Sequence, residues 1–584
     1  MRKYLFTLAC FFMCVAPAFA LDAGLIEATP AVLNKTNENQ LKELEVEKKY
    51  VQTTPKDIEA EKKLLEQQQK KDVVKGNLTY NPKFKLNKII FKGNTVYNDK
   101  QLLKLSGNII GKDIYLDDVM DYVVTLSRFY QRNGYLTSYA YIEPQEIDTG
   151  VVVINIKESR IAAKETSGNR WEKEWYLKNV VLGRKGLNQG DVFNARTLQG
   201  NMKDMNMQAY LKGSAEISKD KNEDTIVKLK VADRLPINLD LSWDNFGRDY
   251  TGRQRFTAIA GLDNVLGYGD RLYGGAIMSS GAVGTMAGYQ IPVNKYGTKL
   301  SFDYQYAKIN LGGPYQGMGI NGNASTYGLR LTHPLINTAT KNLVASVGVD
   351  AVSTKTTGTD MPMALADYSL RVLRTGLYGM FDDRYGRTIG SVGVDMGTNA
   401  LGASGNIDNG QQSVFYKILG SLSRIQRLPK NCLAVARIGG QYSPQSLFAS
   451  EQMYLGGAYS LRGYQPSELL GDYGVAGTFE IRTPVPGLKQ VLPKKAKPFA
   501  DRIKLAAFYD WGYVNSYNDQ YIYATNFLSS VGFGTYINIT DAIFVQVGIG
   551  IPLGPKHLSE NSGRFYFSVN TDIDRMFMKP KERL

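Results

Sequence analysis

The chain has little of what builds disulfide frameworks and metal sites. Its 584 residues include three cysteines and two histidines. Two of the cysteines, Cys10 and Cys14, lie in an apolar N-terminal run that processing is expected to remove, which leaves Cys432 alone. A single cysteine cannot form an internal disulfide, and no Cys/His set has the spacing of a zinc site. The sequence therefore predicts neither a structural metal nor a disulfide-stabilised fold.

Long hydrophobic runs are also scarce. The first 20 residues contain a basic start, one apolar run and Ala18-Phe19-Ala20, which has the small-x-small form of a cleavage site. The alternative, a membrane-anchoring helix, is disfavoured because the run is shorter than the ~20 residues that a spanning helix needs. No later stretch is long and apolar enough for such a helix. We therefore expect a signal peptide over residues 1–20 and a mature chain that is secreted, periplasmic or an outer-membrane barrel.

The residue patterns of an enzyme are missing too. The chain contains no nucleotide-binding loop, no nucleophile triad and no legible acid–base set. The sequence therefore predicts a protein that holds no cofactor and is not an enzyme.

Tyrosine and glycine, in contrast, are abundant, with 37 and 58 residues. Transmembrane β-barrels use aromatic girdles and alternate apolar with polar residues along each strand. Such alternation begins near residue 235 and is clearest over 239–244, 300–306, 327–332, 543–551 and 565–570. Lipid-facing strands must close on themselves, because an open edge leaves backbone groups unpaired in hydrocarbon. Residues 235–584 thus predict a mostly β region, an antiparallel barrel of about sixteen strands whose last strand ends near Ile573 or at Phe577.

Residues 21–80 are polar and rich in charge. The segments 38–51 and 55–71 predict two helices, and the region as a whole predicts a helical arm or simply a flexible periplasmic segment. Solvated charge runs of this kind usually carry no site of their own.

Residues 81–160 predict a small α/β module. A strand around Ile89 and Phe91 precedes a helix whose apolar positions share one face, namely Val119, Tyr122, Val123, Leu126, Phe129 and Tyr130. Gly134 follows the helix, and two strands are expected over 139–143 and 150–157. Residues 161–234 repeat this plan more loosely, with a helix over 194–210 and a strand over 226–231. Neither module is long enough to be a large catalytic domain.

The order of signal peptide, helical arm, two small modules and barrel resembles the TpsB two-partner-secretion transporters, which belong to the BamA/TamA superfamily. The two modules resemble POTRA domains, and the first shares with the family the motif residues Gly134, Tyr135, Pro144, Gln145 and Gly150. It departs from the family at Glu158-Ser159, where Glu-Gly is usual. The second module has Lys221-Asn222-Glu223-Asp224 in place of the usual Pro-Gly hairpin.

The sharpest resemblance lies in the barrel. Leu461-Arg462-Gly463-Tyr464 is similar to the superfamily's Val-Arg-Gly-Tyr/Phe motif, which is carried on a loop that folds into the barrel. Its partner motif, Phe-x-Asp-x-Gly, is matched by Phe508, Asp510 and Gly512. In the family the arginine pairs with the aspartate on the inner wall, and such a pair can be bidentate and strong when shielded from water. The first barrel strands also resemble the family, at 244–247, 251–252 and 263–270.

The resemblance implies a transporter that moves a large unfolded exoprotein across the outer membrane without ATP. The implied partner is a secreted protein with an N-terminal secretion domain, such as a haemolysin or an adhesin. The POTRA modules would lie in the periplasm, and the arm would hold a plug helix in a monomeric barrel surrounded by outer-membrane lipid. Which of the two helices is the plug, and whether the cargo is activated as well as exported, stay open.

Two other functions compete with export. A barrel-assembly factor of the BamA or TamA type is the strongest alternative, but such factors carry more POTRA modules than the two counted in this chain. A passive porin is the next, although a simple diffusion pore has no need of so long a periplasmic region.

Overall fold

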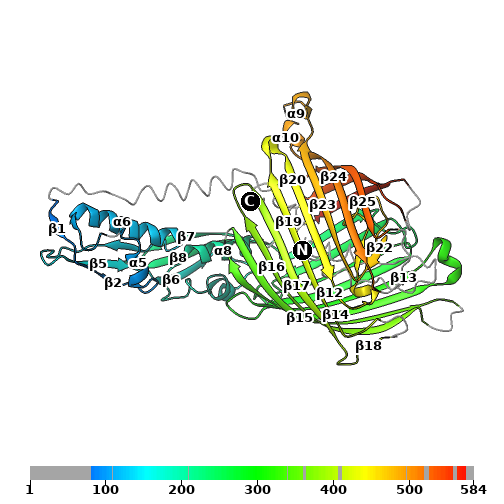
Figure 1. The fold of residues 1–584 in the computed structure, drawn as a ribbon, viewed down its shortest axis with the longest axis horizontal. Coiled ribbons are helices and arrows are strands. Elements are labelled where there is room, and N and C mark those ends of the chain that lie inside the picture. Colours follow the sequence, from blue (N-terminus) through cyan, green and yellow to red (C-terminus); the bar gives the residue numbers. More distant parts are fainter. Residues whose placement is uncertain are drawn as a thin grey trace.

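The computed structural model describes residues 81–573 except for 108, 208–209, 339, 360–363, 406–410, 495, 518–524 and 557–561. The predicted signal peptide (1–20) and helical arm (21–80) lie outside the described residues. Two small α/β units follow one another and lead into a large barrel (Figure 1). The predicted fold class, a mostly β chain with a closed antiparallel barrel after two α/β modules, is confirmed.

The first unit is a three-stranded sheet covered by one long helix. Its elements are β1 (Lys83–Lys85), β2 (Lys88–Lys92), α5 (Asp99–Leu103), β3 (Asp113–Tyr115), α6 (Leu116–Arg132), β4 (Tyr139–Tyr141) and β5 (Val151–Lys157). In the sheet order β2-β5-β4 the first pair is parallel and the second antiparallel. The predicted apolar stripe of α6 is confirmed, because five of its six residues are buried and Phe129 packs at the margin of the same core.

The second unit repeats this plan. Its elements are β6 (Ile161–Ser167), α7 (Glu174–Tyr176), the π-helical turn η2 (Leu177–Val181), α8 (Ala195–Met207), β7 (Leu211–Lys219) and β8 (Thr225–Asp233). The sheet order is β6-β8-β7. Val227, Leu229 and Val231 of β8 face the core while Lys228 and Lys230 face solvent, as the alternation in that strand predicts. No helix among the described residues is long and apolar enough to cross a membrane.

Sixteen antiparallel strands form the barrel, which closes where β27 pairs with β9. They are β9 (Ile237–Asp244), β10 (Arg255–Asp263), β11 (Arg271–Ser279), β12 (Ala282–Pro292), β13 (Lys299–Asn310), β14 (Asn321–Asn337), β15 (Lys341–Thr357), β16 (Ala366–Asp382), β17 (Gly386–Thr398), β19 (Phe415–Arg427), β20 (Leu433–Tyr442), β23 (Tyr473–Pro484), β24 (Ile503–Asn515), β25 (Phe527–Asn538), β26 (Ile543–Pro552) and β27 (Arg564–Asp572). The short β18 (Ser404–Gly405) adds to β16. The last strand therefore ends at Asp572, next to the nearer of the two predicted ends.

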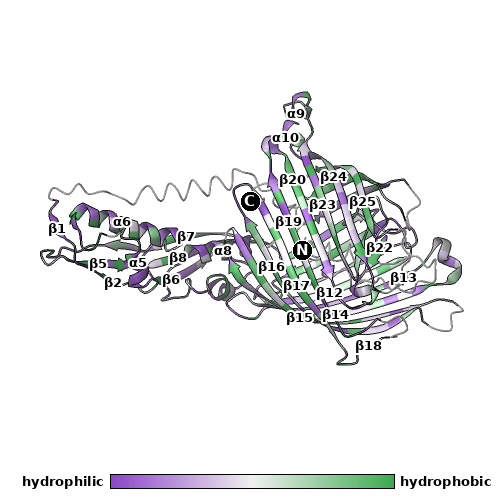
Figure 2. Ribbon diagram, viewed as in Figure 1, coloured by the Kyte–Doolittle hydropathy of each residue, from purple (hydrophilic) through white to green (hydrophobic). Residues whose placement is uncertain are grey.

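The barrel wall is apolar outside and polar inside. In β9, Leu241 and Trp243 are exposed on the outer surface, whereas Asp240, Ser242 and Asp244 are buried on the inner one. Hydrophobic and hydrophilic residues alternate along many of the other strands (Figure 2), and the inner face also carries buried apolar residues such as Ile259, Ile277 and Leu370. This alternation suits a wall that has hydrocarbon on one side and a polar lumen on the other.

The second unit is joined to the barrel at the turn between β10 and β11. The Lys173 ammonium donates to the Leu266 carbonyl at 2.6 Å, and the Asn264 side chain donates to the Trp171 carbonyl at 3.0 Å. The Trp175 ring meets the Tyr268 ring edge to face, with centroids 5.2 Å apart. The turn at 263–270, which the sequence related to the family, is thus one place where the second unit rests on the barrel. A second lies at the end of β14, where the Asn337 side chain donates to Asp204 of α8.

One connection folds into the barrel. Between β20 and β23, residues 443–472 form an internal loop that includes η5 (Ala449–Glu451), β21 (Met453–Leu455) and β22 (Leu469–Gly471). Nearly all of its residues are buried, although it connects two strands at the end of the barrel opposite the α/β units. The remaining helical elements lie between strands and are η3 (Gly313–Met318), η4 (Pro429–Asn431), α9 (Leu488–Val491) and α10 (Lys497–Ala500).

Candidate functional site: a loop anchored inside the barrel

The tip of the internal loop is held to the wall by Arg462. Its Nε donates to Oδ2 of Asp510 at 2.8 Å, and its Nη2 donates to Oδ1 at 2.8 Å. The backbone N–H of Arg462 also donates to Asp510, at 3.1 Å. Asp510 lies on β24 and is fully buried. The two residues that the sequence motifs singled out therefore form a bidentate ion pair between loop and wall, which fixes direction as well as distance.

Two further groups surround the Arg462 guanidinium. Glu480, on the neighbouring strand β23, accepts from Nη1 of Arg462 and also from Arg482. The Phe508 ring lies under the guanidinium, with its centroid 3.3 Å from Cζ. The sequence pointed to Phe508 but missed Glu480. The available signal was its inward-facing position, two residues before Arg482 on an alternating strand.

The rest of the tip is fixed by close packing. Gly463 has φ +102°, and a Cβ there would lie 2.9 Å from the carbonyl carbon of Gly550 on β26. Its N–H donates to the Tyr566 hydroxyl at 2.7 Å. The Tyr464 hydroxyl donates to the Ser529 carbonyl at 3.1 Å. Glycine is required at position 463 because a side chain would be strained by the backbone and by the wall at once.

Leu461 and Gly512 complete the motif by fitting against each other. Leu461 is fully buried in a small apolar cluster with Leu455, Val514 and Leu528. A Cβ at position 512 would lie 2.8 Å from a methyl group of Leu455 and 3.2 Å from one of Leu461. Because Gly512 has no side chain, the loop can pack closely against β24 at this position.

The first barrel strands also contact the loop. Asp244 forms a buried bidentate pair with Arg255, at 2.7 and 3.1 Å. It also accepts from the Phe246 N–H at 2.8 Å. The Phe246 ring meets Tyr459 of the loop and Tyr566 of β27, with centroids 5.5 and 5.8 Å away. The segment 244–247 thus supports the loop tip from the other side of the barrel closure.

The motif residues of the first unit lie elsewhere, and Gly134 contacts the second unit. Gly134 has φ +97°, and its carbonyl accepts from the N–H of Ala195 at 2.8 Å. A Cβ there would lie 2.8 Å from the Asn194 side chain. Tyr135 packs edge to face on Tyr130 at 5.9 Å. Gly134 therefore lies at the joint between the two units, whereas Tyr135 packs within the first.

Gln145 and Gly150 shape one edge of the first sheet. The Gln145 amide donates to the Val153 carbonyl at 2.8 Å and accepts from the Val153 N–H at 2.7 Å. The side chain therefore occupies the part of β5 that β4 leaves unpaired. Gly150 has φ +72°, and a Cβ there would lie 2.3 Å from the Lys85 carbonyl oxygen. Pro144 is exposed beside them.

Glu158-Ser159, which the sequence marked as a departure, ties the two units together. The Glu158 carboxylate accepts from the Val96 N–H at 2.9 Å and from the Tyr130 hydroxyl at 2.7 Å. Burial, followed by this hydrogen bond, raises the pKa of Tyr130 well above its usual value. Ser159 reaches the Thr225 hydroxyl at 2.7 Å. The serine in place of glycine thus supplies a polar contact across the joint.

The predicted residues therefore form two separate sets, one inside the barrel and one in the first unit. Within the part of the chain that the structure describes, no group of three or more His, Cys, Asp or Glu side chains is arranged to hold a metal ion. The chemistry of the barrel set is that of anchoring, because its polar contacts run from loop to wall.

Comparison with known proteins matches two families. The family described as haemolysin secretion/activation protein ShlB/FhaC/HecB matches residues 223–537, and the ShlB-type POTRA domain matches residues 84–159. The heme/hemopexin transporter protein HuxB of Haemophilus influenzae (strain 86-028NP) is 24% identical over 505 residues, which are 82% of this chain and 85% of the relative. The outer membrane transporter CdiB of Dickeya dadantii (strain 3937) is 24% identical over 487 residues, 80% of this chain and 82% of the relative.

Solved structures share the fold. CdiB from Escherichia coli superposes with a TM-score of 0.73 at 21% identity and covers 89% of this chain and 99% of its own. BamA from Haemophilus ducreyi, lacking POTRA domains 1–3, gives a lower TM-score of 0.50 at 12% identity, over 84% of this chain and 100% of its own. The family match spans more than half of the sequence and includes both barrel motifs. The chain therefore belongs to the ShlB/FhaC/HecB family and is an outer-membrane transporter of a two-partner secretion system, with its POTRA region in the periplasm.

Proposed function

We propose that this transporter exports a large unfolded exoprotein that carries its own N-terminal secretion domain, and that the Arg462–Asp510 pair is needed for that export. The observation that carries the proposal is the internal loop fixed in the lumen by a buried, bidentate ion pair. A barrel of sixteen strands otherwise encloses an aqueous channel. A loop inside that channel lies on the path of any exported chain, so its position decides what passes.

The POTRA region supplies surfaces that suit reception of an extended chain. The two sheets have the orders β2-β5-β4 and β6-β8-β7, so β2, β4, β6 and β7 are edge strands among the described residues. Strand β7 is the longest of the four, and most of its side chains are exposed. Edge strands accept an extended segment by backbone pairing, while side-chain pockets set the register. We propose that the secretion domain is received at such an edge.

Energy for export must come from the cargo, since the outer membrane has no ATP. We propose that the exoprotein folds after it emerges and that this folding biases movement outward. In the resting state, residues 21–80 would contribute a plug helix to the lumen. The names of HuxB and CdiB describe one transporter linked to heme and hemopexin and one outer membrane transporter, which supports a secreted partner for this chain without identifying it.

The test replaces each member of the tip pair in cells that also express the exoprotein. Arg462→Ala leaves Asp510 without its partner, and Asp510→Ala leaves Arg462 with Glu480 alone, so either change removes the bidentate pair that fixes the loop tip. We expect export into the medium, measured by immunoblot, to fall at least about tenfold. Heat-modifiable mobility on gels should show that the barrel still assembles.

A matched control removes an ion pair that is exposed. Lys355 and Asp367 lie 3.3 Å apart on β15 and β16, with more than half of each side chain accessible. Lys355→Ala should leave export unchanged, because exposed pairs contribute little. Normal export by both Arg462→Ala and Asp510→Ala would refute the role given to the tip pair.

A further inference from the structure

The first half of the internal loop lies against a different part of the barrel from its tip. The tip contacts β23 to β27, whereas Leu447, Phe448 and Glu451 pack against β15, β16 and β19. The Phe448 ring stacks on the Tyr368 ring of β16 at 4.4 Å. The loop therefore crosses the lumen between two contact regions, and the one at its base coincides with none of the motifs that the sequence singled out.

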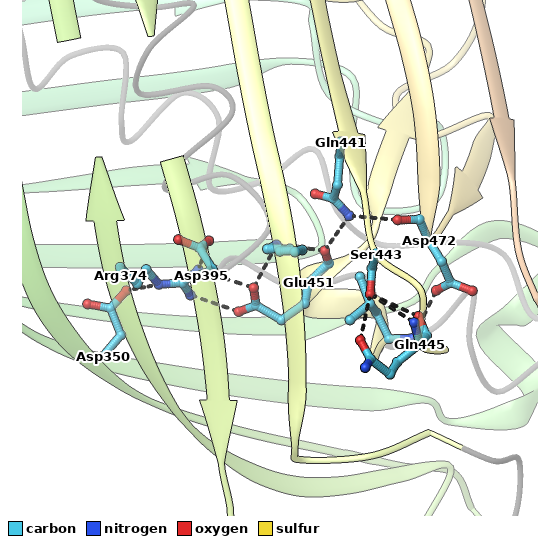
Figure 3. Close-up of polar contacts among 10 residues, drawn as sticks. Asp350, Arg374, Asp395, Gln441, Ser443, Gln445, Glu451 and Asp472 are labelled. Atoms are coloured by element: carbon cyan, nitrogen blue, oxygen red, sulfur yellow. Dashed lines mark hydrogen bonds and ion pairs between the residues drawn. The ribbon is translucent and has the colours of Figure 1, made fainter. Parts of the chain in front are cut away.

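The base contact is centred on Arg374, an inward-facing residue of β16 (Figure 3). Its Nε pairs with Asp350 of β15 at 2.5 Å, and its Nη1 pairs with Asp395 of β17 at 2.8 Å. Nη2 pairs with Oε1 of Glu451, in the loop, at 2.7 Å. The guanidinium of Arg374, on β16, thus joins the neighbouring strands β15 and β17 to the loop.

Two further wall residues bind Glu451. The Lys417 ammonium of β19 lies 2.7 Å from Oε2 of Glu451 and donates to its backbone carbonyl at 2.7 Å. The Gln441 amide of β20 donates to the same carbonyl at 2.9 Å (Figure 3). All of these groups are buried, and Glu451 is fully buried. Hydrogen bonds to ionised groups are stronger than neutral ones, and a low local dielectric strengthens them further.

Two wall cations contact the loop carboxylate directly. Without the loop, the two cations Arg374 and Lys417 face the two anions Asp350 and Asp395, so the wall cluster is formally neutral. Glu451 adds a negative charge that both cations contact directly. The loop is therefore bound by cations that the wall holds in place, and the wall pairs remain when the loop carboxylate is removed.

Asp472 closes the base of the loop. Its carboxylate accepts from the Leu447 N–H at 2.9 Å and from the Gln452 amide at 3.0 Å, both near the start of the loop. It also accepts from the Ser516 hydroxyl at 2.7 Å, in the turn after β24. Because Asp472 is the last residue of the loop, this contact holds the two ends of the loop together and leaves Glu451 facing the wall.

We propose that Arg374 and Lys417 form a second anchor that binds the internal loop through Glu451, and that Arg374, Lys417 and Glu451 are positioning residues for export. The proposal rests on the export function proposed above. The loop is held at its base on β16 and β19 and at its tip on β24. These two attachments fix its path across the lumen. None of the three residues needs to contact the cargo, because they act by fixing where the loop lies.

The experiment measures loop position and export in the same cells. Cys432→Ser removes the cysteine of the mature chain, and Ser450→Cys places a thiol at a fully buried loop position beside Glu451. A membrane-impermeant maleimide added outside reports whether that thiol is exposed. Glu451→Gln removes the charge and keeps the shape. We expect it to raise the labelling rate at least about tenfold, as expected when charge-assisted hydrogen bonds are lost, and to lower export of the exoprotein several-fold.

Two variants keep the proposal open to refutation. If Glu451→Gln fails to assemble, Lys417→Gln takes its place, because it removes one cation and leaves the Arg374–Glu451 pair. Asp367→Asn, on the exposed side of the same strand as Arg374, is the matched control and should change neither readout. Thiol labelling that stays at the parental level in Glu451→Gln would overturn the anchor.

Increased labelling with normal export would overturn the positioning role. Failure of the proposed export function gives a different pattern. In that case Arg462→Ala exports normally, while the labelling rate at position 450 still reports whether the base of the loop is anchored. The two proposals can therefore fail independently.

Discussion

The internal loop is attached to the barrel wall at two places with opposite polarity. At the tip the loop supplies the cation, Arg462, and the wall supplies the carboxylates of Asp510 and Glu480. At the base the loop supplies the carboxylate of Glu451, and the wall supplies Arg374 and Lys417. The loop carries a cation at its tip and a carboxylate at its base, and each faces wall groups of the opposite sign. This favours one direction of the loop across the lumen, because a reversed loop would bring like charges together.

The two attachments also differ in shielding. The side chain of Arg462 is 11% exposed, whereas that of Arg374 is 2% exposed and contacts three carboxylates. A cation that is fully enclosed by anions is part of the fold, since its loss leaves those anions facing each other. The tip is held by a single loop cation whose side chain is partly exposed. We therefore expect damage at the base to affect assembly first and damage at the tip to affect export first.

The largest expected effect follows from removing Arg374. Arg374→Met leaves Asp350, Asp395 and Glu451 buried together without the guanidinium that all three contact, and breaking a buried charge network typically costs about 3–5 kcal/mol. We expect most of the protein to lose its heat-modifiable, assembled form. Adding Glu451→Gln should restore part of the assembled fraction, because it removes one of the three carboxylates.

The measurement for this comparison is the assembled fraction on gels of outer-membrane preparations. Arg371→Met serves as the matched control, since Arg371 lies three residues before Arg374 on the other face of β16 and donates to the Leu401 carbonyl and to Ser369 rather than to a buried carboxylate. Full assembly of Arg374→Met would remove the distinction drawn between the two attachments.

The contrast between the attachments also explains how much the sequence predicted. Period-two alternation indicated the barrel because each strand separates lipid from lumen, and the apolar stripe of α6 indicated the first unit for a similar reason. Arg462 and Asp510 were found through two short motifs. Arg374 and Glu451 carry no local signal, because a polar residue at an inward position is ordinary in a barrel strand. Their contact joins residues 77 positions apart, which only the closed barrel and the folded loop bring together.

An intermediate effect is expected from Arg462→Lys. Lysine keeps the charge but cannot donate to both oxygens of Asp510 while also reaching Glu480, and it lacks the planar group that lies on the Phe508 ring. We expect export between that of the parent and that of Arg462→Ala, with normal assembly. Export assays on the three proteins at matched barrel levels test this. Parental export by Arg462→Lys would mean that the charge alone matters at the tip, as it would for a simple ion pair.

The smallest effect concerns Glu172 in the second unit, a buried carboxyl that forms no ion pair with the residues the structure describes. It accepts from the Tyr210 hydroxyl at 2.7 Å. Burial raises the pKa of Glu172 to about 7; the hydrogen bonds from Tyr210 and from the Lys173 N–H oppose this shift, and nearby Asp233 and Asp270 add to it. Glu451 and Glu480, by contrast, face arginines. Glu172 therefore separates the effect of burying a glutamate from the effect of pairing it.

Because its folded pKa lies above the unfolded value, Glu172 contributes stability that is present at low pH and is lost as the pH rises through about 7. At ~1.4 kcal/mol per pKa unit the second unit should lose up to about 3 kcal/mol between pH ~5 and pH ~8. Glu172→Gln removes this titration, so limited proteolysis of the full-length protein in detergent should show a flatter pH dependence of cleavage in that unit. The tip variant Arg462→Lys should keep the parental pH dependence there, since it changes no group in the second unit. An unchanged pH profile in Glu172→Gln would mean that another group sets the pH response of the second unit, and that burial alone does not distinguish Glu172 from the paired glutamates Glu451 and Glu480.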